Sequence, residues 1–475
     1  MSLQITTRAG DPVMIDDEAL TAFDTAVRGE IVTAESADYD ELRAVWNRMI
    51  DRHPALIVRC TGTADVVTAV NFARENDLLL AVRGGGHNAA GSATCQGGMM
   101  IDLSLMKGVF VDAPGRTVRV QGGATLGDVD HETQLYGLAT PLGVVSETGV
   151  AGLTLGGGYG HLRRRYGLSC DNILSVEIVT ADGQVRTASA EENSDLFWAI
   201  RGGGGNFGVV TSFEFQLYPV GPTVYYIGVM YPQETVGDVL PAWLDFMDQA
   251  PREFSCNCLY WTIPDVDAFP PEARNVDIVA ISGVHIGPLD EAAEALQPLR
   301  ELGEPVLDLS GEYPFTAVQA IFDWVFPKNQ LYNYWKSLYG DPISDEAADV
   351  IYEWVQQRPT NTIMFDIWAM GGAITDVAAE DSAMGDRSAP VTYVFNTSWV
   401  DPELTDDCLT WTRDFYEALL PYSPGGSYLN FPGFMGEEEG LVHRAYGRNY
   451  ERLAHVKAAY DPQNLFSVNM NVQPA

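Results

Sequence analysis

The chain has 475 residues, of which 46% are hydrophobic and 11% aromatic. That length allows two or three domains with large cores, and the composition excludes a disordered chain. Acidic residues dominate, because 65 Asp and Glu against 28 Lys and Arg give a net charge of −37. Charge of this sign repels nucleic acids and anionic membranes, so we expect neither as a partner and expect a small, neutral substrate instead.

The cysteines and the N-terminus bear on location and metal content. The six cysteines show no metal-ligand spacing beyond Cys256-Asn-Cys258, which has no further Cys or His pair near it, so we predict no metal site. The first residues lack the basic-then-apolar layout of a signal peptide, and no window approaches the roughly 18 consecutive apolar residues of a membrane span. We therefore predict a cytoplasmic protein without a disulfide framework.

The N-terminal part has the pattern of an α/β unit. Residues 1–35 show no strong periodicity, and we expect a mobile arm with a short helix there. Apolar residues recur at helical spacing over 38–51, which predicts a helix. A strand at 56–59, a helix at 65–76 and a strand at 78–82 follow, and the last strand leads into a glycine-rich loop. Phosphate sites form at such strand ends.

The pattern changes after the turn at Pro219–Pro222. Before it, we predict strands at 99–103, 110–112, 116–121, 173–180, 184–187 and 209–217, and helices at 126–136 and from 195 to 200. Beyond it, strands at 224–230, 276–284, 363–369 and 391–399 interleave with helices at 236–249, 289–302, 345–356 and 406–420, and a last helix spans 440–460. This order predicts one broad sheet with helices on a single face.

The glycine-rich loop reads Arg83-Gly-Gly-Gly-His-Asn-Ala-Ala-Gly91. Because glycine reaches backbone conformations that other residues avoid, the loop can curl around a phosphate and direct N–H groups at its oxygens. His87 leaves this turn, where its imidazole suits a covalent link to a cofactor. Glycine-rich turns are common, however, and a histidine after one is often an ordinary loop residue.

A second glycine-rich segment runs from Thr148 to Asn172 and ends in Gly167-Leu-Ser-Cys-Asp-Asn172. Its glycines lie at positions 149, 152, 156, 157, 158, 160 and 167. Each glycine costs conformational entropy on folding, so their density is better explained by close approach of the backbone to a flat ligand than by packing.

These two segments, with Asp195-Leu-Phe-Trp-Ala-Ile-Arg-Gly-Gly-Gly-Gly-Asn-Phe-Gly208 and Tyr460-Asp-Pro-Gln-Asn-Leu-Phe466, closely resemble the FAD-linked oxidases of the berberine bridge enzyme-like group in the vanillyl-alcohol oxidase superfamily. The resemblance covers nearly the whole chain. It implies an α+β fold, in which a PCMH-type, two-subdomain FAD-binding fold joins a substrate domain with an antiparallel sheet covered by helices. The implied division is 1–218 for the N-terminal part of the FAD-binding domain, 219–436 for the substrate-binding domain, and 437–475 for a segment that returns to the FAD-binding domain.

The same resemblance implies FAD attached at two points. In doubly tethered members, a histidine bonds the 8α-methyl of the flavin and a cysteine bonds C6, and by position these are His87 and Cys170. The other expected cofactor-binding residues come from the glycine-rich segments, a neighbouring strand and the C-terminal tail: Arg83, Gly84, Gly85, Gly86, Asn88, Ser92, Thr148, Gly149, Gly152, Gly156, Gly157, Gly158, Gly160, His161, Asn172, Val179, Asn469 and Asn471.

Removal of a hydroxyl proton during hydride transfer to flavin N5 needs a base within hydrogen-bond reach. The resembled family places a tyrosine of a Tyr-x-Asn motif there, which is Tyr428 with Asn430 in this chain. We expect its pKa to be lowered if its neighbours favour the phenolate. Tyr393 and Asn396 on the strand at 391–399 are further candidates for the pocket. Most tryptophans are expected in the core, with Trp368 as the one chosen to stack on a substrate ring.

The implied activity is that of an FAD oxidase, which takes a hydride from a CH–OH centre of an alcohol, sugar or similar molecule and passes electrons to O2, giving H2O2. Ala89 stands where saccharide-oxidising relatives carry a tyrosine, which argues against a sugar. The alternatives are a dehydrogenase with another acceptor, an oxidase of a CH–NH or polyketide-like substrate, and a flavin-storing or structural protein with a decayed site. The oligomeric state is not indicated.

The charge of −37 also suggests a salt-adapted host. Raising KCl from about 0.1 M to about 1 M shortens the Debye length from about 10 Å to about 3 Å and so screens the repulsion among acidic side chains. We expect the midpoint of thermal unfolding to rise over this range, as followed by circular dichroism. Stability that instead increases as salt is removed would contradict a halophilic protein.

Overall fold

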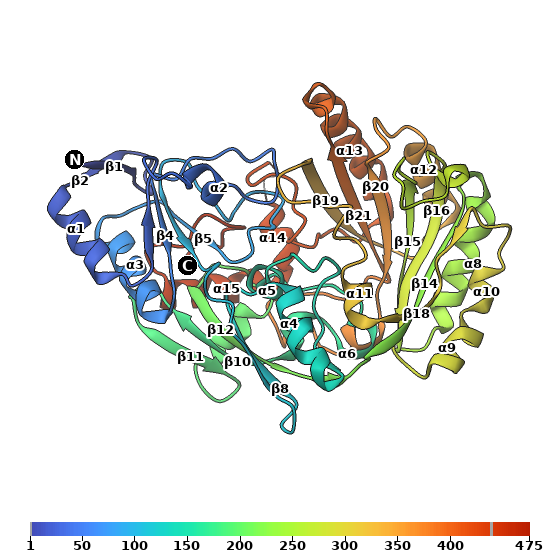
Figure 1. The fold of residues 1–475 in the computed structure, drawn as a ribbon, viewed down its shortest axis with the longest axis horizontal. Coiled ribbons are helices and arrows are strands. Elements are labelled where there is room, and N and C mark those ends of the chain that lie inside the picture. The colour runs from blue at the N-terminus through green and yellow to red at the C-terminus, as the bar shows by residue number, and fades with distance from the viewer. Residues whose placement is uncertain (1, 438–439) are drawn as a thin grey trace.

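The computed structural model describes residues 2–437 and 440–475 and divides into two parts that meet along a central cavity (Figure 1). One part carries a four-stranded and a five-stranded sheet, and the other carries an eight-stranded antiparallel sheet with helices on its outer side. The predicted α+β class is confirmed. Within the described residues, no helix is long and apolar enough to cross a membrane.

The four-stranded sheet supplies the first glycine-rich loop. Its strand order is β3 (Glu30–Val32), β4 (Leu56–Arg59), β6 (Met99–Asp102) and β5 (Leu80–Arg83), and β4, β6 and β5 run parallel. The helix α3 (Thr63–Glu75) connects β4 to β5. Because a parallel sheet is covered on both faces, its strands are continuous apolar runs, and the loop emerges at the C-terminal end of β5.

Residues 2–35 are ordered, contrary to the expectation of a mobile arm. They form a hairpin of β1 (Leu3–Thr6) and β2 (Pro12–Ile15), followed by α1 (Asp17–Ala26). Ile5 and Phe23 are buried, and the Phe23 ring stacks on Phe72 of α3 at 4.0 Å. The anchoring side chains are too few and too widely spaced to produce a periodic pattern, so only their tertiary partners reveal them.

The five-stranded antiparallel sheet carries the second glycine-rich segment. Its strand order is β11 (Val185–Ser189), β10 (Ile173–Val179), β12 (Val209–Gln216), β8 (Thr117–Gln121) and β7 (Val109–Asp112). The shorter elements packed around it and beneath the cavity are α4 (Leu126–Thr133), β9 (Leu138–Ala139), α5 (Val150–Leu155), α6 (Arg163–Tyr166), α7 (Ser194–Ile200) and β13 (Tyr218–Pro219).

The eight-stranded sheet forms the far wall of the cavity. Its strands are β17 (Leu307–Asp308), β14 (Thr223–Pro232), β16 (Asp277–His285), β15 (Phe254–Thr262), β20 (Met364–Ala369), β21 (Val391–Trp399) and β19 (Tyr332–Gly340), with β18 (Gly311–Pro314) paired to β14. The helices of this part are α8 (Val236–Gln249), α9 (Leu289–Ala295), α10 (Gln297–Arg300), α11 (Phe315–Gln319), α12 (Asp345–Val355) and α13 (Thr405–Leu419).

Most of these helices cover one face, as predicted (Figure 1). The sequence did not reveal β15 and β19, because buried polar residues such as Ser255, Asn333 and Ser337 interrupt their apolar runs.

The predicted helix at 38–51 is much shorter in the structure. The helix α2 spans only Tyr39–Arg43, and the chain turns extended at Ala44. Trp46 causes the difference: its backbone N–H donates to the Gly86 carbonyl at 3.0 Å, and its indole N–H donates to the Phe326 carbonyl at 2.8 Å. These long-range contacts outweigh the local helical pattern.

The C-terminal segment returns to the N-terminal part, beside the five-stranded sheet (Figure 1). The predicted helix at 440–460 is broken at Gly447 into α14 (Leu441–Tyr446) and α15 (Tyr450–Tyr460). Lys457 is fully buried and donates to Asp461, to the Asn206 carbonyl and to the Phe466 carbonyl at 2.7–2.9 Å. Asp461 also accepts from the Phe466 backbone N–H at 2.9 Å. One ammonium group therefore ties the tail to the glycine run at 202–205.

Replacing Lys457 by Met tests this anchor. The change leaves the Asp461 carboxylate buried without its cation, so we expect the free energy of unfolding in urea to fall by about 3–5 kcal/mol. Arg448→Ala serves as the control because its ion pair with Glu380 is exposed on both sides and contributes little. Equal effects of the two changes would show that the buried pair does not stabilise the tail.

Candidate active site

The cavity between the two parts has a volume of about 270 Å³. Three regions line it: the two glycine-rich segments, the glycine run at 204–205 with the C-terminal tail, and the inner face of the eight-stranded sheet. Of the predicted residues, those that line it are Gly84, Gly85, Gly86, His87, Asn88, Ser92, Thr148, Gly149, Gly152, Gly156, Trp368, Asn396, Tyr428, Asn430 and Asn469.

The two glycine-rich segments touch through their backbones. A Cβ atom placed on Gly85 would lie 2.5 Å from the Cα atom of Gly149, which no side chain tolerates. Gly86 has a φ of +71°, in the left-handed region that favours glycine. The glycines therefore permit both the close approach and the sharp turn that precedes His87.

His87 is held between aromatic rings. Trp46 stacks on its imidazole with ring centroids 4.3 Å apart, and Trp335 lies at 6.4 Å. Its Nε2 atom is buried without a hydrogen-bond partner, and the residue lines the cavity. Burial lowers the pKa of His87 to about 4, so the imidazole is neutral at physiological pH and retains a nucleophilic nitrogen.

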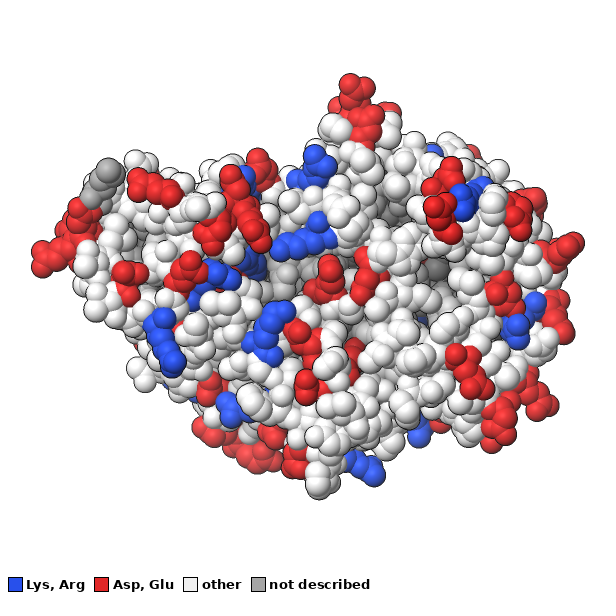
Figure 2. All heavy atoms as spheres, in the orientation of Figure 1, with Lys and Arg blue, Asp and Glu red and all other residues white. Residues whose placement is uncertain are grey.

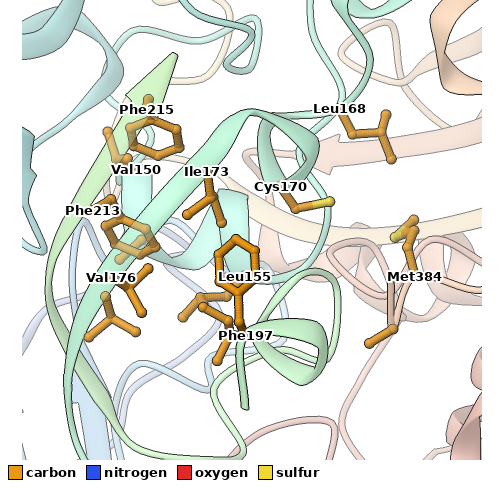
Figure 3. Close-up of a cluster of buried hydrophobic side chains, with 14 of the residues drawn as sticks. Val150, Leu155, Leu168, Cys170, Ile173, Val176, Phe197, Phe213, Phe215 and Met384 are labelled. Atoms are coloured by element: carbon orange, nitrogen blue, oxygen red, sulfur yellow. The ribbon is translucent and has the colours of Figure 1, made fainter. Parts of the chain in front are cut away.

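Cys170 lies elsewhere. It does not line the cavity, and its side chain sits within the apolar cluster beside Leu155, Ile173 and Phe197 (Figure 3). The thiol donates to the Asp171 carboxylate at 3.6 Å, and that carboxylate pairs with Arg387 at 2.7 Å. Burial raises the pKa of the Cys170 thiol, which disfavours the thiolate needed for bond formation. The structure thus does not bring the two expected attachment residues to one site.

Several other expected cofactor-binding residues form contacts within the protein and do not face the cavity. Arg83 turns away from the cavity to pair with Asp102, with nitrogen–oxygen distances of 3.0 and 2.6 Å. Asn172 donates to the carbonyls of Tyr166 and Leu168 and so closes its own turn. The remaining ones that do not line the cavity are Gly157, Gly158, Gly160, His161, Val179 and Asn471. These glycines, His161 and Val179 are buried against neighbouring segments of the protein.

Tyr428 is placed as predicted and is almost completely buried. Its phenolic oxygen accepts hydrogen bonds from the backbone N–H groups of Gly158 and Tyr159 at 3.1 and 3.3 Å and from the Asn430 amide at 2.7 Å. The ring stacks on Tyr159 with centroids 4.0 Å apart. A protonated phenol oxygen has too few lone pairs to accept three hydrogen bonds well. The three donors therefore favour the phenolate. Burial is nevertheless the largest effect, and it raises the pKa of Tyr428 instead of lowering it as expected.

Tyr393 does not belong to the site. Along β21, Val391, Tyr393 and Phe395 face the helices, whereas Asn396 faces the cavity. Successive side chains of a strand point to opposite faces, so residues three apart cannot share one. The expectation that Tyr393 and Asn396 line the same pocket is therefore wrong for Tyr393.

The sequence did not single out Asp366, which lines the cavity on β20. Its carboxylate accepts from the Asn396 amide at 2.6 Å and from the Trp368 indole at 3.4 Å, and its Oδ1 atom is buried without a partner. Burial raises the pKa of Asp366 to about 7. The sequence carried only a weak signal for it, an acidic residue within an otherwise apolar strand. Asn257 and the Gly204-Gly205-Asn206 run were also missed as lining residues.

These features fit FAD. Side-chain-free backbone at 84–86, 149 and 204–205 suits a diphosphate and a flat ring, and the unpartnered polar atoms of His87 and Asn469 lie at the wall of the same cavity. A buried tyrosine held by backbone N–H groups lies at the same cavity. The fold and site thus define a flavin-dependent oxidoreductase.

Comparisons with known proteins agree. The family model for an FAD binding domain matches residues 54–189, and the model described as berberine and berberine like matches residues 427–473. (R)-6-hydroxynicotine oxidase from Paenarthrobacter nicotinovorans is 31% identical, with coverage of 94% of this chain and 97% of that protein. An uncharacterized FAD-linked oxidoreductase, YgaK from Bacillus subtilis, is 30% identical, with coverage of 95% and 98%.

Solved structures share the fold. The crystal structure of 6-hydroxy-D-nicotine oxidase from Arthrobacter nicotinovorans superposes with a TM-score of 0.84 at 29% identity, covering 94% of this chain and 98% of that chain. A chitooligosaccharide oxidase superposes with a TM-score of 0.83 at 23% identity, covering 96% and 99%, which supports the fold alone. The chain belongs to the berberine bridge enzyme-like, PCMH-type FAD-linked oxidoreductases.

Proposed function

We propose that this FAD-linked oxidoreductase is an oxidase that removes a hydride from a carbon bearing an O–H or N–H group, with O2 as the electron acceptor and H2O2 as the product. The observation that carries the proposal is Tyr428, whose oxygen is surrounded by three donors at the wall of the cavity. FAD, when bound, supplies the hydride acceptor. The CH–OH reaction remains the first candidate, and a dehydrogenase with a non-oxygen acceptor remains an alternative.

In this mechanism Tyr428 acts as its phenolate, which receives the proton of the substrate O–H or N–H as the carbon–hydrogen bond breaks. The N–H groups of Gly158 and Tyr159 hold its oxygen in place and stabilise negative charge before the proton arrives. Asn430 completes this arrangement, because its amide also donates to the Leu153 carbonyl and is thereby fixed. The aromatic and aliphatic walls exclude water from the substrate.

Oxidation of a CH–NH centre is the second candidate function. Two observations favour it: the 31% identity to a protein named (R)-6-hydroxynicotine oxidase, and the buried Asp366 carboxylate at the cavity wall. The intact arrangement around Tyr428 argues against a decayed site that only stores flavin. No observation favours a polyketide-like substrate.

We also propose that His87 is the single covalent attachment point of FAD, in place of the two that the family resemblance implied. Its neutral imidazole, with an unpartnered Nε2 at the cavity, supports a bond there. The position of Cys170 in the apolar cluster argues against a second bond.

The surface charge bears on the partners and the host of the protein. Acidic side chains outnumber basic ones on the visible face of the molecule, where several of the basic ones lie near the middle (Figure 2). This distribution supports a small-molecule substrate, no binding of nucleic acid or membranes, and a halophilic host. We also propose a cytoplasmic location and domain boundaries at 218/219 and 436/437.

Variants of the two expected attachment residues test the linkage. His87→Ala should release all flavin into the supernatant on acid precipitation, because no other nucleophile is expected to hold it. Cys170→Ser is the matched control and should keep the flavin bound, with a flavin mass on the His87 peptide alone. A flavin adduct on the Cys170 peptide of the wild-type protein would contradict a single linkage.

Tyr428→Phe tests the base. Loss of the proton acceptor should slow anaerobic reduction of the flavin about 10²-fold to 10⁴-fold, measured by absorbance after mixing with an oxidisable alcohol or amine. Tyr393→Phe is the matched control, since its hydroxyl faces the helix-covered core, and it should reduce at the wild-type rate. An unchanged rate in Tyr428→Phe would exclude the proposed role. Peroxide release in air separates an oxidase from a dehydrogenase.

A further inference from the structure

Asp366 faces the cavity because of its register in β20. Met364, Asp366 and Trp368 line the cavity, whereas Phe365 and Ile367 pack among the helices on the other face. The neighbouring strands place Asn257 and Asn396 beside this row, so three polar side chains form one patch. Asp366 is 5% exposed.

One oxygen of this carboxylate is satisfied and the other is not. Oδ2 accepts from the Asn396 amide at 2.6 Å and from the Trp368 indole at 3.4 Å. Oδ1 is buried and has no hydrogen-bond partner among the described residues. Two donors therefore fix the orientation of the carboxylate and leave one acceptor for a molecule in the cavity.

The nearby cation Arg163 attracts the Asp366 carboxylate but forms no ion pair with it. Arg163 lies over the Trp368 ring at 5.0 Å, but its guanidinium donates to the carbonyls of Gly160, Cys256 and Ala369 and to the Asn257 side chain. Every nitrogen of Arg163 is thus already engaged. No ion pair of Asp366 with a Lys or Arg is found within the described part of the chain.

The rest of the cavity wall carries no opposite charge. Asp366 is the only Asp, Glu, Lys or Arg among the described residues that line it. His87 is neutral at physiological pH, and the wall around the polar patch is mainly apolar, with Leu259, Phe431 and Trp335. Burial makes the ionised form of Asp366 costly and raises its pKa to about 7, so a cationic ligand would stabilise the carboxylate.

We propose that the substrate carries a protonated amine that donates a hydrogen bond to Asp366 Oδ1, which makes Asp366 the residue that selects a small, largely apolar monocation. A hydroxyl would satisfy the hydrogen bond but leave the buried charge unpaired. The net charge of −37 favours the same choice, because it attracts cations toward the molecule. The neutral substrate expected from composition is thereby replaced. The inference rests on the proposed function only in that this cavity holds the substrate.

A matched pair of probes tests the selection. Benzylamine and benzyl alcohol share one frame and differ in the cationic group, and their binding to the holoenzyme is followed by the perturbation of flavin absorbance. The wild-type protein should bind benzylamine about 10-fold to 100-fold more tightly, and Asp366→Asn should remove this preference. Asp406→Asn, on the exposed surface of α13, is the control for loss of one charge and should keep the preference.

Salt separates a local contact from the field of the whole molecule. The preference should persist at about 1 M KCl, where the field of surface charges is screened but a buried contact is not. A wild-type protein that binds the alcohol as tightly as the amine, an Asp366→Asn variant that keeps the preference, or a preference lost in salt would each overturn the inference. Binding is measured without turnover, so the two proposals can fail separately. A protein that prefers benzylamine but oxidises neither probe would support this inference and count against the proposed oxidation.

Discussion

The direct backbone contact between Gly85 and Gly149 is the constraint on which the site depends. It joins the loop after β5 of the parallel sheet to the loop before α5, and any side chain at either position would force the two apart. The contact fixes His87 on one side and begins, on the other, the segment whose N–H groups hold Tyr428. Two sheets with separate cores thus share one cavity because two residues lack a Cβ atom.

Three buried ion pairs hold parts of the fold together. Lys457 pairs with Asp461 to hold the tail, Arg83 pairs with Asp102 beneath the first loop, and Arg387 pairs with Asp171 next to Cys170. Each pair also takes hydrogen bonds from neighbouring groups, which offsets the cost of burial. Asp366 differs because one of its oxygens is left free. Asp366 lies on the cavity wall, which makes it a candidate for ligand binding.

Some site residues are marked by a local sequence pattern, whereas the placement of others depends on side-chain direction. The glycine-rich segments and the Tyr-x-Asn motif of Tyr428 were found because residue type and spacing alone mark them, and both line the cavity. Cys170 and Tyr393 were misplaced because their roles depend on which way a side chain points, and a one-residue difference along a strand or turn reverses that direction. Trp46 was assigned to a helix although its contacts with Gly86 and Phe326 pull it out of one.

The sequence by itself determined the class of the protein, its two glycine-rich segments, Tyr428 as the candidate base and the order of most strands and helices, because each of these leaves a local signal in residue type or spacing. Only the tertiary structure decided which of the two expected attachment residues reaches the cavity, how residues 2–35 are held, and that Asp366 lies at the cavity wall without an ion pair among the described residues. Those outcomes depend on partners far away in the chain, such as Arg387 for Cys170 and Arg163 for Asp366. The sequence pattern records neighbours along the chain and not neighbours in space, so it could not predict these contacts.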